Sequence, residues 1–261
     1  MSKNFRLWFD MCLFEASRFR TYPHEIAAGV FSRLAEVALF SSFWFIVGQT
    51  NGAGINLTDI LGYYLIMSGL MPFFYLGFGV GGMIIDMIKS GELNQTLIRP
   101  INPILHPWAI RTGRNAINIA FGILQVTVGM VISGGVRAEA LPMLVPVLLN
   151  TAALNASFNI FLGAMGFYLT DGRNFKNAFF HVALFCRGER MPLYLMEPAF
   201  AHLLMLTPFP ASIYHLTMLL HGVHLPTWPE VLVGSVWTAA LLLASVKIWK
   251  LGLRRYEAVG I

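Results

Sequence analysis

Long apolar runs separated by short basic segments dominate the chain. Most of these runs are long enough to cross a bilayer core as a helix, which takes about 20 residues. A helix is also the open-chain structure that satisfies its own backbone hydrogen bonds in lipid. The pattern therefore predicts an all-α polytopic membrane protein with six transmembrane helices. The runs cover residues 29–48, 61–85, 116–133 and 141–169, a short stretch that begins near residue 177, and residues 231–248.

The N-terminal segment 1–25 has the pattern of an amphipathic interfacial helix that lies in the membrane surface. Its apolar residues recur at i, i+3, i+4 and i+7, and its charged residues fall mostly on the opposite side. The segment lacks the uninterrupted apolar core of a cleavable signal peptide. A soluble amphipathic helix packed on a partner is the alternative interpretation. The apolar face consists of Phe5, Trp8, Phe9, Cys12, Leu13, Ala16 and Phe19.

The segment 191–225 is apolar but interrupted, which predicts an outer re-entrant segment rather than a span. A full crossing here would place the basic C-terminal tail on the side opposite to the other basic segments. Two half-helices, over residues 193–206 and 211–220, avoid this conflict, because irregular backbone is tolerated at membrane depth where protein or water covers it. The interruptions are Pro192, Pro198, Pro208 and Pro210, and Pro226 follows the segment.

Composition and charge support a membrane location and orient the chain. Of the 261 residues, 56% are hydrophobic and 12% are charged, whereas a soluble domain carries about 25% charged residues. With a cytoplasmic N-terminus, fourteen Lys and Arg residues lie inside and three, Arg137, Arg187 and Arg190, lie outside. This bias is typical of membrane orientation and gives no indication of a nucleic-acid partner. We expect a multi-pass protein of the cell (inner) membrane with both termini cytoplasmic. The two cysteines, Cys12 and Cys186, then lie on opposite sides without a disulfide.

The chain carries little that indicates chemistry of its own. It contains no GxxxxGK[ST] sequence, so we expect no ATP and no other cofactor to be bound by this chain. Gly77, Gly79 and Gly82 match a dinucleotide fingerprint literally, but they lie inside an apolar run, which favours close helix packing. Three histidines near the outer face have spacings that scatter them around a helix, so we expect no metal site. They are His215, His221 and His224.

Polar side chains inside the apolar runs are candidates for function. Thr151, Asn155 and Asn159 recur at i, i+4 and i+8 in the fourth run. Such groups are costly in lipid, so they either hydrogen-bond helix to helix or line a substrate path. Arg33 and Glu36 lie three residues apart in the first run and can pair along one helix face. A contact with a second membrane subunit is the alternative role for this pair.

Three motifs carry a resemblance to a known family. The segment 88–103 contains the G-x-L-x-x-x-L-x-R-P pattern, and residues 252–260 contain G-x-x-R-Y-E-x-x-G. Between them, Gly188, Pro192 and Leu193 are followed by the Thr-Pro-Phe sequence 207–209. Together these motifs resemble the type-2 exporter class of ATP-binding-cassette permeases, in the branch of daunorubicin-type and viologen-type drug exporters. This chain differs by having Glu189 and Arg190 where that family usually has apolar residues.

The resemblance implies a single transmembrane permease domain, 1–261, that moves a hydrophobic or amphipathic substrate outward. Two permease subunits, identical or related, would each bind an ATPase subunit that holds ATP and Mg. The segment 88–110 would couple to the ATPase through Gly91, Glu92, Leu93, Leu97, Arg99 and Pro100. The outer gate would include Gly188, Pro192, Pro208 and Phe209. A non-transporting membrane scaffold or assembly factor is the main alternative, and a membrane enzyme that uses the outer histidines is another.

Overall fold

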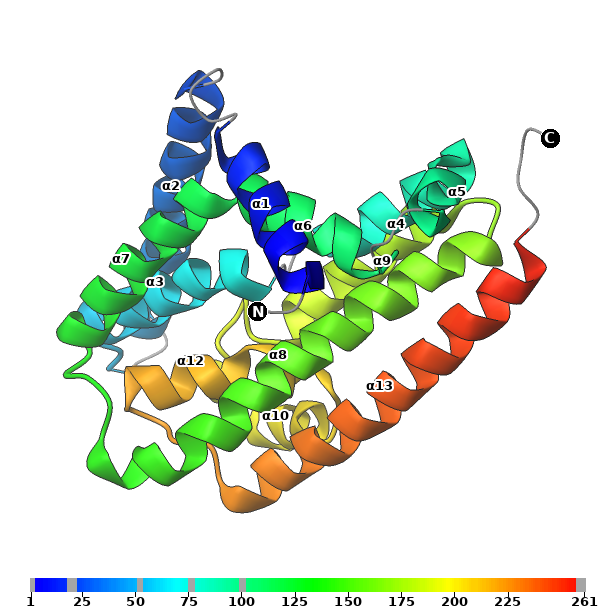
Figure 1. Ribbon diagram of the computed structural model, residues 1–261. Helices are drawn as coiled ribbons and strands as arrows, with labels where there is room; N and C mark the ends of the chain where they lie inside the picture. The colour runs from blue at the N-terminus through cyan, green and yellow to red at the C-terminus, as the bar shows by residue number, and fades with distance from the viewer. Residues whose placement is uncertain (1–2, 18–22, 51–53, 75–77, 99–101, 257–261) are drawn as a thin grey trace.

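The computed structural model describes all residues except 1–2, 18–22, 51–53, 75–77, 99–101 and 257–261. The described residues form helices and connecting segments and contain no strand, which confirms the predicted all-α class. Figure 1 shows the arrangement. The elements are α1 (Lys3–Ser17), α2 (Pro23–Thr50), α3 (Leu57–Phe74), α4 (Gly79–Ser90), α5 (Glu92–Leu97), α6 (Leu105–Arg114), α7 (Ala116–Ile132), η2 (Ala138–Ala140), α8 (Leu141–Ala164), η3 (Met165–Phe167), α9 (Gly172–Cys186), η4 (Leu193–Leu195), α10 (Pro198–Met205), α11 (Phe209–Ser212), α12 (Tyr214–His221) and α13 (Trp228–Arg255).

Four segments within the described part of the chain are long and apolar enough to cross a membrane. They are Ala27–Thr50, Leu57–Ser90, Ala138–Phe167 and Trp228–Arg255. A fifth results if α6 and α7, which meet at 67°, count as one span. Helix α9 has 15 residues, or about 22 Å, which is shorter than a hydrocarbon core of about 30 Å. The protein is therefore a multi-pass membrane protein, whereas the sixth span stays a prediction.

The spans form two groups that diverge in Figure 1, with α12 between them. Helices α2, α3 and α7 pack together on one side, and α4, α8 and α13 pack on the other. Helices α3 and α7 cross where glycines face each other. A Cβ added to Gly69 would lie 2.7 Å from the carbonyl oxygen of Gly122, and one added to Gly129 would lie 3.0 Å from that of Gly62. Only glycine allows the two backbones to approach this closely, as is common between membrane helices.

The second apolar run lies within one candidate span, Leu57–Ser90, as predicted, but this span consists of two helices and not one. Helix α3 ends at Phe74 and α4 begins at Gly79. Pro72 lies in the last turns of α3, and Phe78 has a left-handed backbone with φ of 51°. Proline removes a helical hydrogen bond, and the left-handed conformation is unfavourable for a residue with a Cβ. Phe78 is buried against Phe158, Phe179 and Phe180, and this packing offsets the backbone strain.

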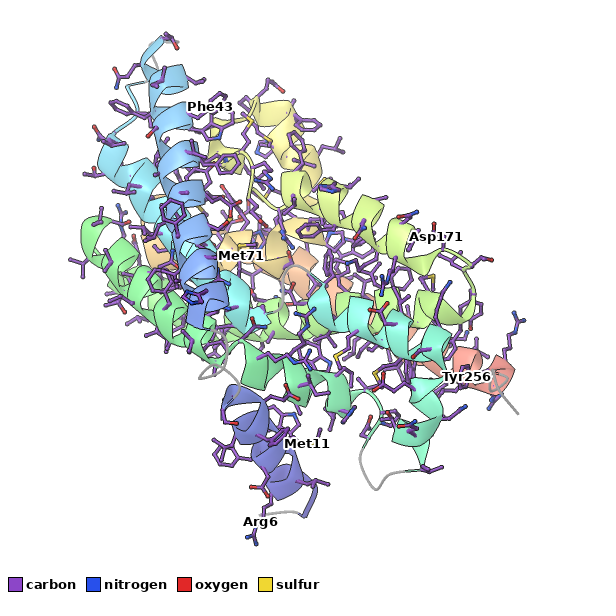
Figure 2. All side chains as sticks on the ribbon, turned by 90° about the horizontal axis from the view of Figure 1, so that it is seen from above. Arg6, Met11, Phe43, Met71, Asp171 and Tyr256 are labelled. Carbon is purple, nitrogen blue, oxygen red and sulfur yellow. The ribbon has the colours of Figure 1, made fainter. Side chains whose placement is uncertain are left out.

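Helix α1 lies at the edge of the molecule, and its Arg6 points away from the bundle (Figure 2). It packs on α6: the Cys12 thiol is 3.4 Å from the Ala109 carbonyl oxygen, and Arg114 pairs with Glu15 at 2.8 Å. Phe9 and Leu13 of the predicted apolar face remain exposed. The helix therefore packs on its own chain through one side, and it keeps an apolar side of the kind that interfacial helices insert into a membrane.

The 191–225 segment consists of short helices. Helices α10 and α12 have eight residues each, or about 12 Å, and correspond to the two predicted half-helices. Neither is long enough to cross a bilayer. Helix α12 is buried against α3 and α8 and ends at Gly222, whose φ is 76°. The segment thus enters the space between the two helix groups and returns, and the side of the membrane from which it enters stays a prediction.

Candidate functional site

Helix α5 is a short element held at a sharp turn after α4. Gly91 has φ of 78° and ends α4 in the left-handed conformation, which is common for a glycine at the end of a helix. Leu93 is 1% exposed and packs in a cluster with Met87, Ile88 and Trp249. Leu97 and Ile98 are 43% and 86% exposed. The helix is therefore fixed to the membrane domain by one side and presents an apolar tip on the other.

A charged depression adjoins this tip. Its volume is ≈ 590 Å³, which lies within the range of about 300–1,000 Å³ that is usual for ligand clefts. Arg173 pairs with Asp86 at 2.6 Å, and Lys89 donates a hydrogen bond to the Thr170 carbonyl oxygen. Glu92 of α5 also lines the depression and is exposed. An apolar knob beside a charged hollow is a surface suited to docking a protein.

The polar stripe of α8 binds the backbone of neighbouring segments. Thr151 Oγ1 donates to the Ala211 carbonyl oxygen at 3.2 Å, and Asn155 Nδ2 donates to that of Ser212 at 2.6 Å. Asn159 Oδ1 accepts from the Gly81 amide at 2.9 Å. The stripe thus attaches α8 to α11 on one side and to the first turn of α4 on the other. This geometry favours helix-to-helix hydrogen bonding, and a role in a substrate path or a subunit interface stays a prediction.

Replacing Asn155 with leucine should loosen α11 from α8. The Ser212 carbonyl loses its donor inside the protein, and such losses between membrane helices cost about 0.6–2 kcal/mol. We expect a melting temperature lowered by a few degrees in detergent and faster proteolysis within the 191–225 segment. Ser157→Ala is the matched control, because Ser157 is equally buried but donates only within its own helix, to the Ala153 carbonyl oxygen at 2.8 Å. Equal effects of the two substitutions would contradict the assignment.

The turn after α9 holds the candidate gate residue Gly188. Its φ is 80°, and its carbonyl oxygen accepts a hydrogen bond from the Tyr63 hydroxyl at 2.7 Å. A Cβ there would lie 2.8 Å from the Tyr63 hydroxyl oxygen and 2.8 Å from a ring carbon of Tyr214. Pro192 precedes η4, and Pro208 precedes α11. Phe209 stacks on Phe158 at 5.8 Å. These residues line the junction between the two helix groups.

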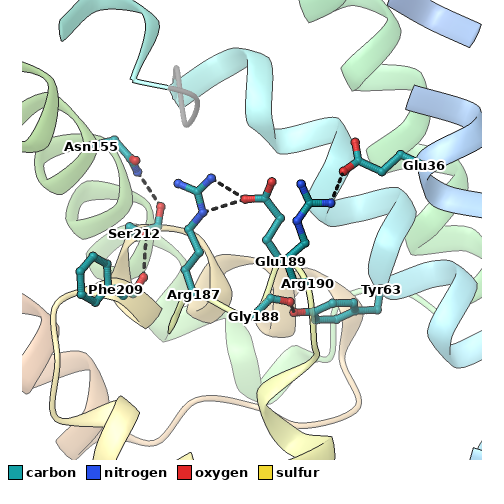
Figure 3. Close-up of polar contacts among 9 residues, drawn as sticks. All are labelled: Glu36, Tyr63, Asn155, Arg187, Gly188, Glu189, Arg190, Phe209 and Ser212. Carbon is teal, nitrogen blue, oxygen red and sulfur yellow. Dashed lines mark hydrogen bonds and ion pairs between the residues drawn. The ribbon is translucent and has the colours of Figure 1, made fainter. Parts of the chain in front are cut away.

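Two ion pairs flank this turn (Figure 3). Arg187 Nε donates to Glu189 at 2.7 Å, and both side chains are buried, with 1% and 7% exposed. The Arg187 guanidinium also lies 5.7 Å from the ring centres of Phe78 and Phe180. Arg190 pairs with Glu36 of α2 at 3.2 Å, and these side chains are 43% and 37% exposed. The turn therefore ties α2 to the 191–225 segment.

The sequence of the chain also identifies its family. The sequence model of the ABC-2 family transporter protein matches residues 25–260. The chain belongs to the ABC-2 transporter family. No match is found among curated proteins. The match confirms the resemblance to type-2 ABC permeases, while the drug-exporter branch stays a prediction. The protein is thus the membrane component of an ABC transporter, and its family implies association with an ABC ATPase.

The structure of this ABC-2 permease corrects two predictions about site residues. Leu93 was predicted to insert into the ATPase, but it is buried within its own chain and is not available. Arg33 and Glu36 were predicted to pair along α2, but Glu36 instead pairs with Arg190. The backbone of Arg190 is held close to α2 and α3, because its carbonyl oxygen accepts hydrogen bonds from Trp44 and Tyr64. Arg99 and Pro100 lie outside the described residues.

The three histidines that the sequence places near the outer face make different contacts. His221 Nε2 is 2.8 Å from the Asp59 carbonyl oxygen, and the His224 ring lies 4.9 Å from that of Tyr194. His215 is buried, 3% exposed, beside the pocket that His224 also lines. Across the described residues, no three His, Cys, Asp or Glu side chains are placed to hold a metal ion.

Sequence reasoning did not foresee the Arg187–Glu189 pair or the aromatic cluster around Phe78. The sequence does carry a signal for the Arg187–Glu189 pair, because two opposite charges two residues apart follow a largely apolar stretch. The second carries no local signal, because its rings come from α8, α9, α11 and the residue before α4.

Proposed function

We propose that this ABC-2 permease is the membrane subunit of an exporter that moves a hydrophobic or amphipathic substrate outward. The observation that carries the proposal is α5, with its inner side anchored by Leu93 and its exposed apolar tip at Leu97 and Ile98. The chain has no P-loop sequence, so ATP and Mg would be held by a separate ATPase subunit, and no cofactor by this chain. Docking at α5 would transmit the conformational change of the ATPase to α4.

The partners would be one ATPase subunit and a second permease, identical or related. Support for a second permease comes from Glu36 and Arg190, which this chain leaves 37% and 43% exposed. Exposed charges within a membrane protein face a water-filled path or another subunit rather than lipid. A water-filled path between two permeases would place these charges beside both water and a second subunit. The aromatic cluster around Phe78 would close the outer end of this path.

We further propose that both termini face the cytoplasm of a cell (inner) membrane, as the distribution of Lys and Arg indicates. In a background with Cys12 and Cys186 replaced by serine, an impermeant thiol reagent should label Thr58→Cys from outside intact cells. Gln95→Cys, on the exposed side of α5, should react only after permeabilisation. Labelling of Gln95→Cys in intact cells would overturn this orientation.

Reconstitution tests the function directly. The tagged full chain, co-expressed with the ATPase encoded beside it, should retain that ATPase through purification. In proteoliposomes it should move a neutral fluorescent amphiphile with ATP but not with a non-hydrolysable analogue. A complex in which the ATPase lysine of the P-loop is replaced serves as the matched control. Stable expression of the permease without a bound ATPase, and without ATP-driven movement of any probe, would favour a scaffold or assembly factor.

A further inference from the structure

A pocket of ≈ 310 Å³ lies between the 191–225 segment and the first turn of α13. Its walls come from η4, α10, α12, the connection that follows α12, and α13. A water molecule occupies about 30 Å³ in the liquid, so the pocket has room for a ligand of about ten non-hydrogen atoms. Glu230 lines it from the beginning of a candidate span, which places the pocket toward the surface of the membrane rather than at its centre.

The charge of this pocket is negative. The Glu230 carboxylate lines it, and Asp59 lies within electrostatic reach of the lining residue Tyr194. Among the described residues, no Lys or Arg lines the pocket. Such a site attracts a cation and repels an anion. Its other polar groups are the imidazoles of His202, His215 and His224 and the phenols of Tyr194 and Tyr214.

Glu230 uses one of its two carboxylate oxygens within the protein. Its Oε2 accepts a hydrogen bond from the Thr227 amide at 2.7 Å, as part of the capping box that begins α13. Its Oε1 makes no hydrogen bond or ion pair with the described residues, and the side chain is only half-buried, so this oxygen is not enclosed. An ammonium group is the ligand that fits such an oxygen, because it donates charge-assisted hydrogen bonds to a carboxylate.

The rest of the pocket suits the apolar body of a small ligand. The rings of Tyr194 and His224 lie 4.9 Å apart, and Tyr214 is also part of the wall. Aromatic rings pack against apolar groups, and the face of a tyrosine also attracts a cation. Four apolar side chains complete this part of the wall, those of Leu193, Met205, Met218 and Leu225.

We propose that this pocket binds a small primary amine, with its ammonium group at Glu230 and its apolar body against the aromatic and aliphatic wall. A bound amine would connect α10 and α12 with the beginning of α13 and so restrain the 191–225 segment. A small acid would meet the Glu230 carboxylate without a cation to pair with. The site goes beyond the proposed export and is tested on the permease alone, without ATP or an ATPase.

Three probes of similar size that share a phenyl ring separate the effect of charge from that of shape. Phenethylamine carries the ammonium group, 2-phenylethanol is neutral, and phenylacetate is an anion. Each is titrated calorimetrically into the full chain in phosphatidylcholine nanodiscs, at about pH 8, where free imidazole is neutral. Titration into empty nanodiscs gives the contribution of the lipid. We expect one saturable site for the amine, with an affinity about tenfold above that of the alcohol, and no binding of the acid.

Glu230→Gln removes the charge and keeps the helix cap, because glutamine also serves in a capping box. This variant should bind the amine about tenfold more weakly, no better than the alcohol. Glu197→Gln is the matched control: Glu197 caps α10 by accepting from the Phe200 amide at 3.1 Å, but it does not line the pocket. Its affinity for the amine should equal that of the unchanged chain. Equal affinities for the amine and the alcohol, or an unchanged preference in Glu230→Gln, would overturn the inference.

Protection of a thiol tests the location of the site without changing Glu230. In the background with Cys12 and Cys186 replaced by serine, Ala201→Cys lies in the wall of the pocket. The neighbouring Phe200→Cys replaces a side chain that is 43% exposed and lies outside that wall. Phenethylamine at about ten times its Kd should slow the reaction of Ala201→Cys with a thiol reagent about tenfold and leave that of Phe200→Cys unchanged. An unchanged rate at Ala201→Cys, or equal slowing at both positions, would refute binding in this pocket.

Discussion

Replacing Leu97 and Ile98 together with aspartate is expected to release the ATPase subunit or to leave it bound but uncoupled. Both side chains are largely exposed at the tip of α5, so two carboxylates there would place unpaired charges in an apolar protein contact. Losses at such anchors reach 2 kcal/mol or more each, which lowers affinity roughly thirtyfold per residue. The membrane fold should survive, because Leu93, the residue that anchors α5 inward, is unchanged.

Co-purification of the ATPase and substrate-stimulated ATP hydrolysis measure this effect, and the melting temperature of the permease checks its fold. Leu57→Asp is the matched control, since Leu57 is 45% exposed but begins α3, in the helix group that does not contain α4. Normal co-purification and coupling in the double variant would place the ATPase contact elsewhere on the permease.

Arg187→Met is expected to be the most destabilising single substitution at the turn after α9. It leaves the Glu189 carboxylate, 7% exposed, buried without its partner, and breaking a buried pair from one side costs about 3–5 kcal/mol. We expect the melting temperature to fall by about 10 °C. The double variant Arg187→Met with Glu189→Met should recover most of this loss, because a buried pair replaced by apolar side chains is often neutral.

Thermal unfolding in detergent of the single and double variants gives the coupling between the two residues. Arg190→Met is the comparison, since its partner Glu36 is 37% exposed, and exposed pairs contribute about 0–1 kcal/mol. A double variant as unstable as Arg187→Met alone would show that Arg187 stabilises the protein through contacts other than Glu189.

The sequence predicted the features that depend on local pattern. The apolar runs 29–48 and 231–248 fall inside α2 and α13, because a span must be continuously apolar. Gly91 of the predicted coupling segment ends α4 in the left-handed conformation, which glycine adopts without a Cβ clash. The prolines of the 191–225 segment predicted a broken element, since proline cannot continue a helix.

Features that depend on distant contacts were not predictable from the sequence. Glu36 has an arginine three residues away, but its partner Arg190 is 154 residues away, and no local rule distinguishes the two. Leu93 and Leu97 are both leucines of a six-residue helix, yet one is buried and the other exposed. A helix of fewer than two turns is too short for its periodicity to indicate which side faces inward.

Helix α4 connects the exposed tip of α5 with the aromatic cluster around Phe78, so a displacement of α5 can reach that cluster. Its 12 residues make a rod of about 18 Å, with the α5 tip at one end and Phe78 at the other. The rod has left-handed residues, Phe78 and Gly91, at both ends, and helical hydrogen bonds make it stiff between them. A push on α5 would therefore tilt α4 as a lever about its contact with α8, where Gly81 meets Asn159. The other end of α4 lies in the aromatic cluster, so a small displacement of the α5 tip would move Phe78 sideways.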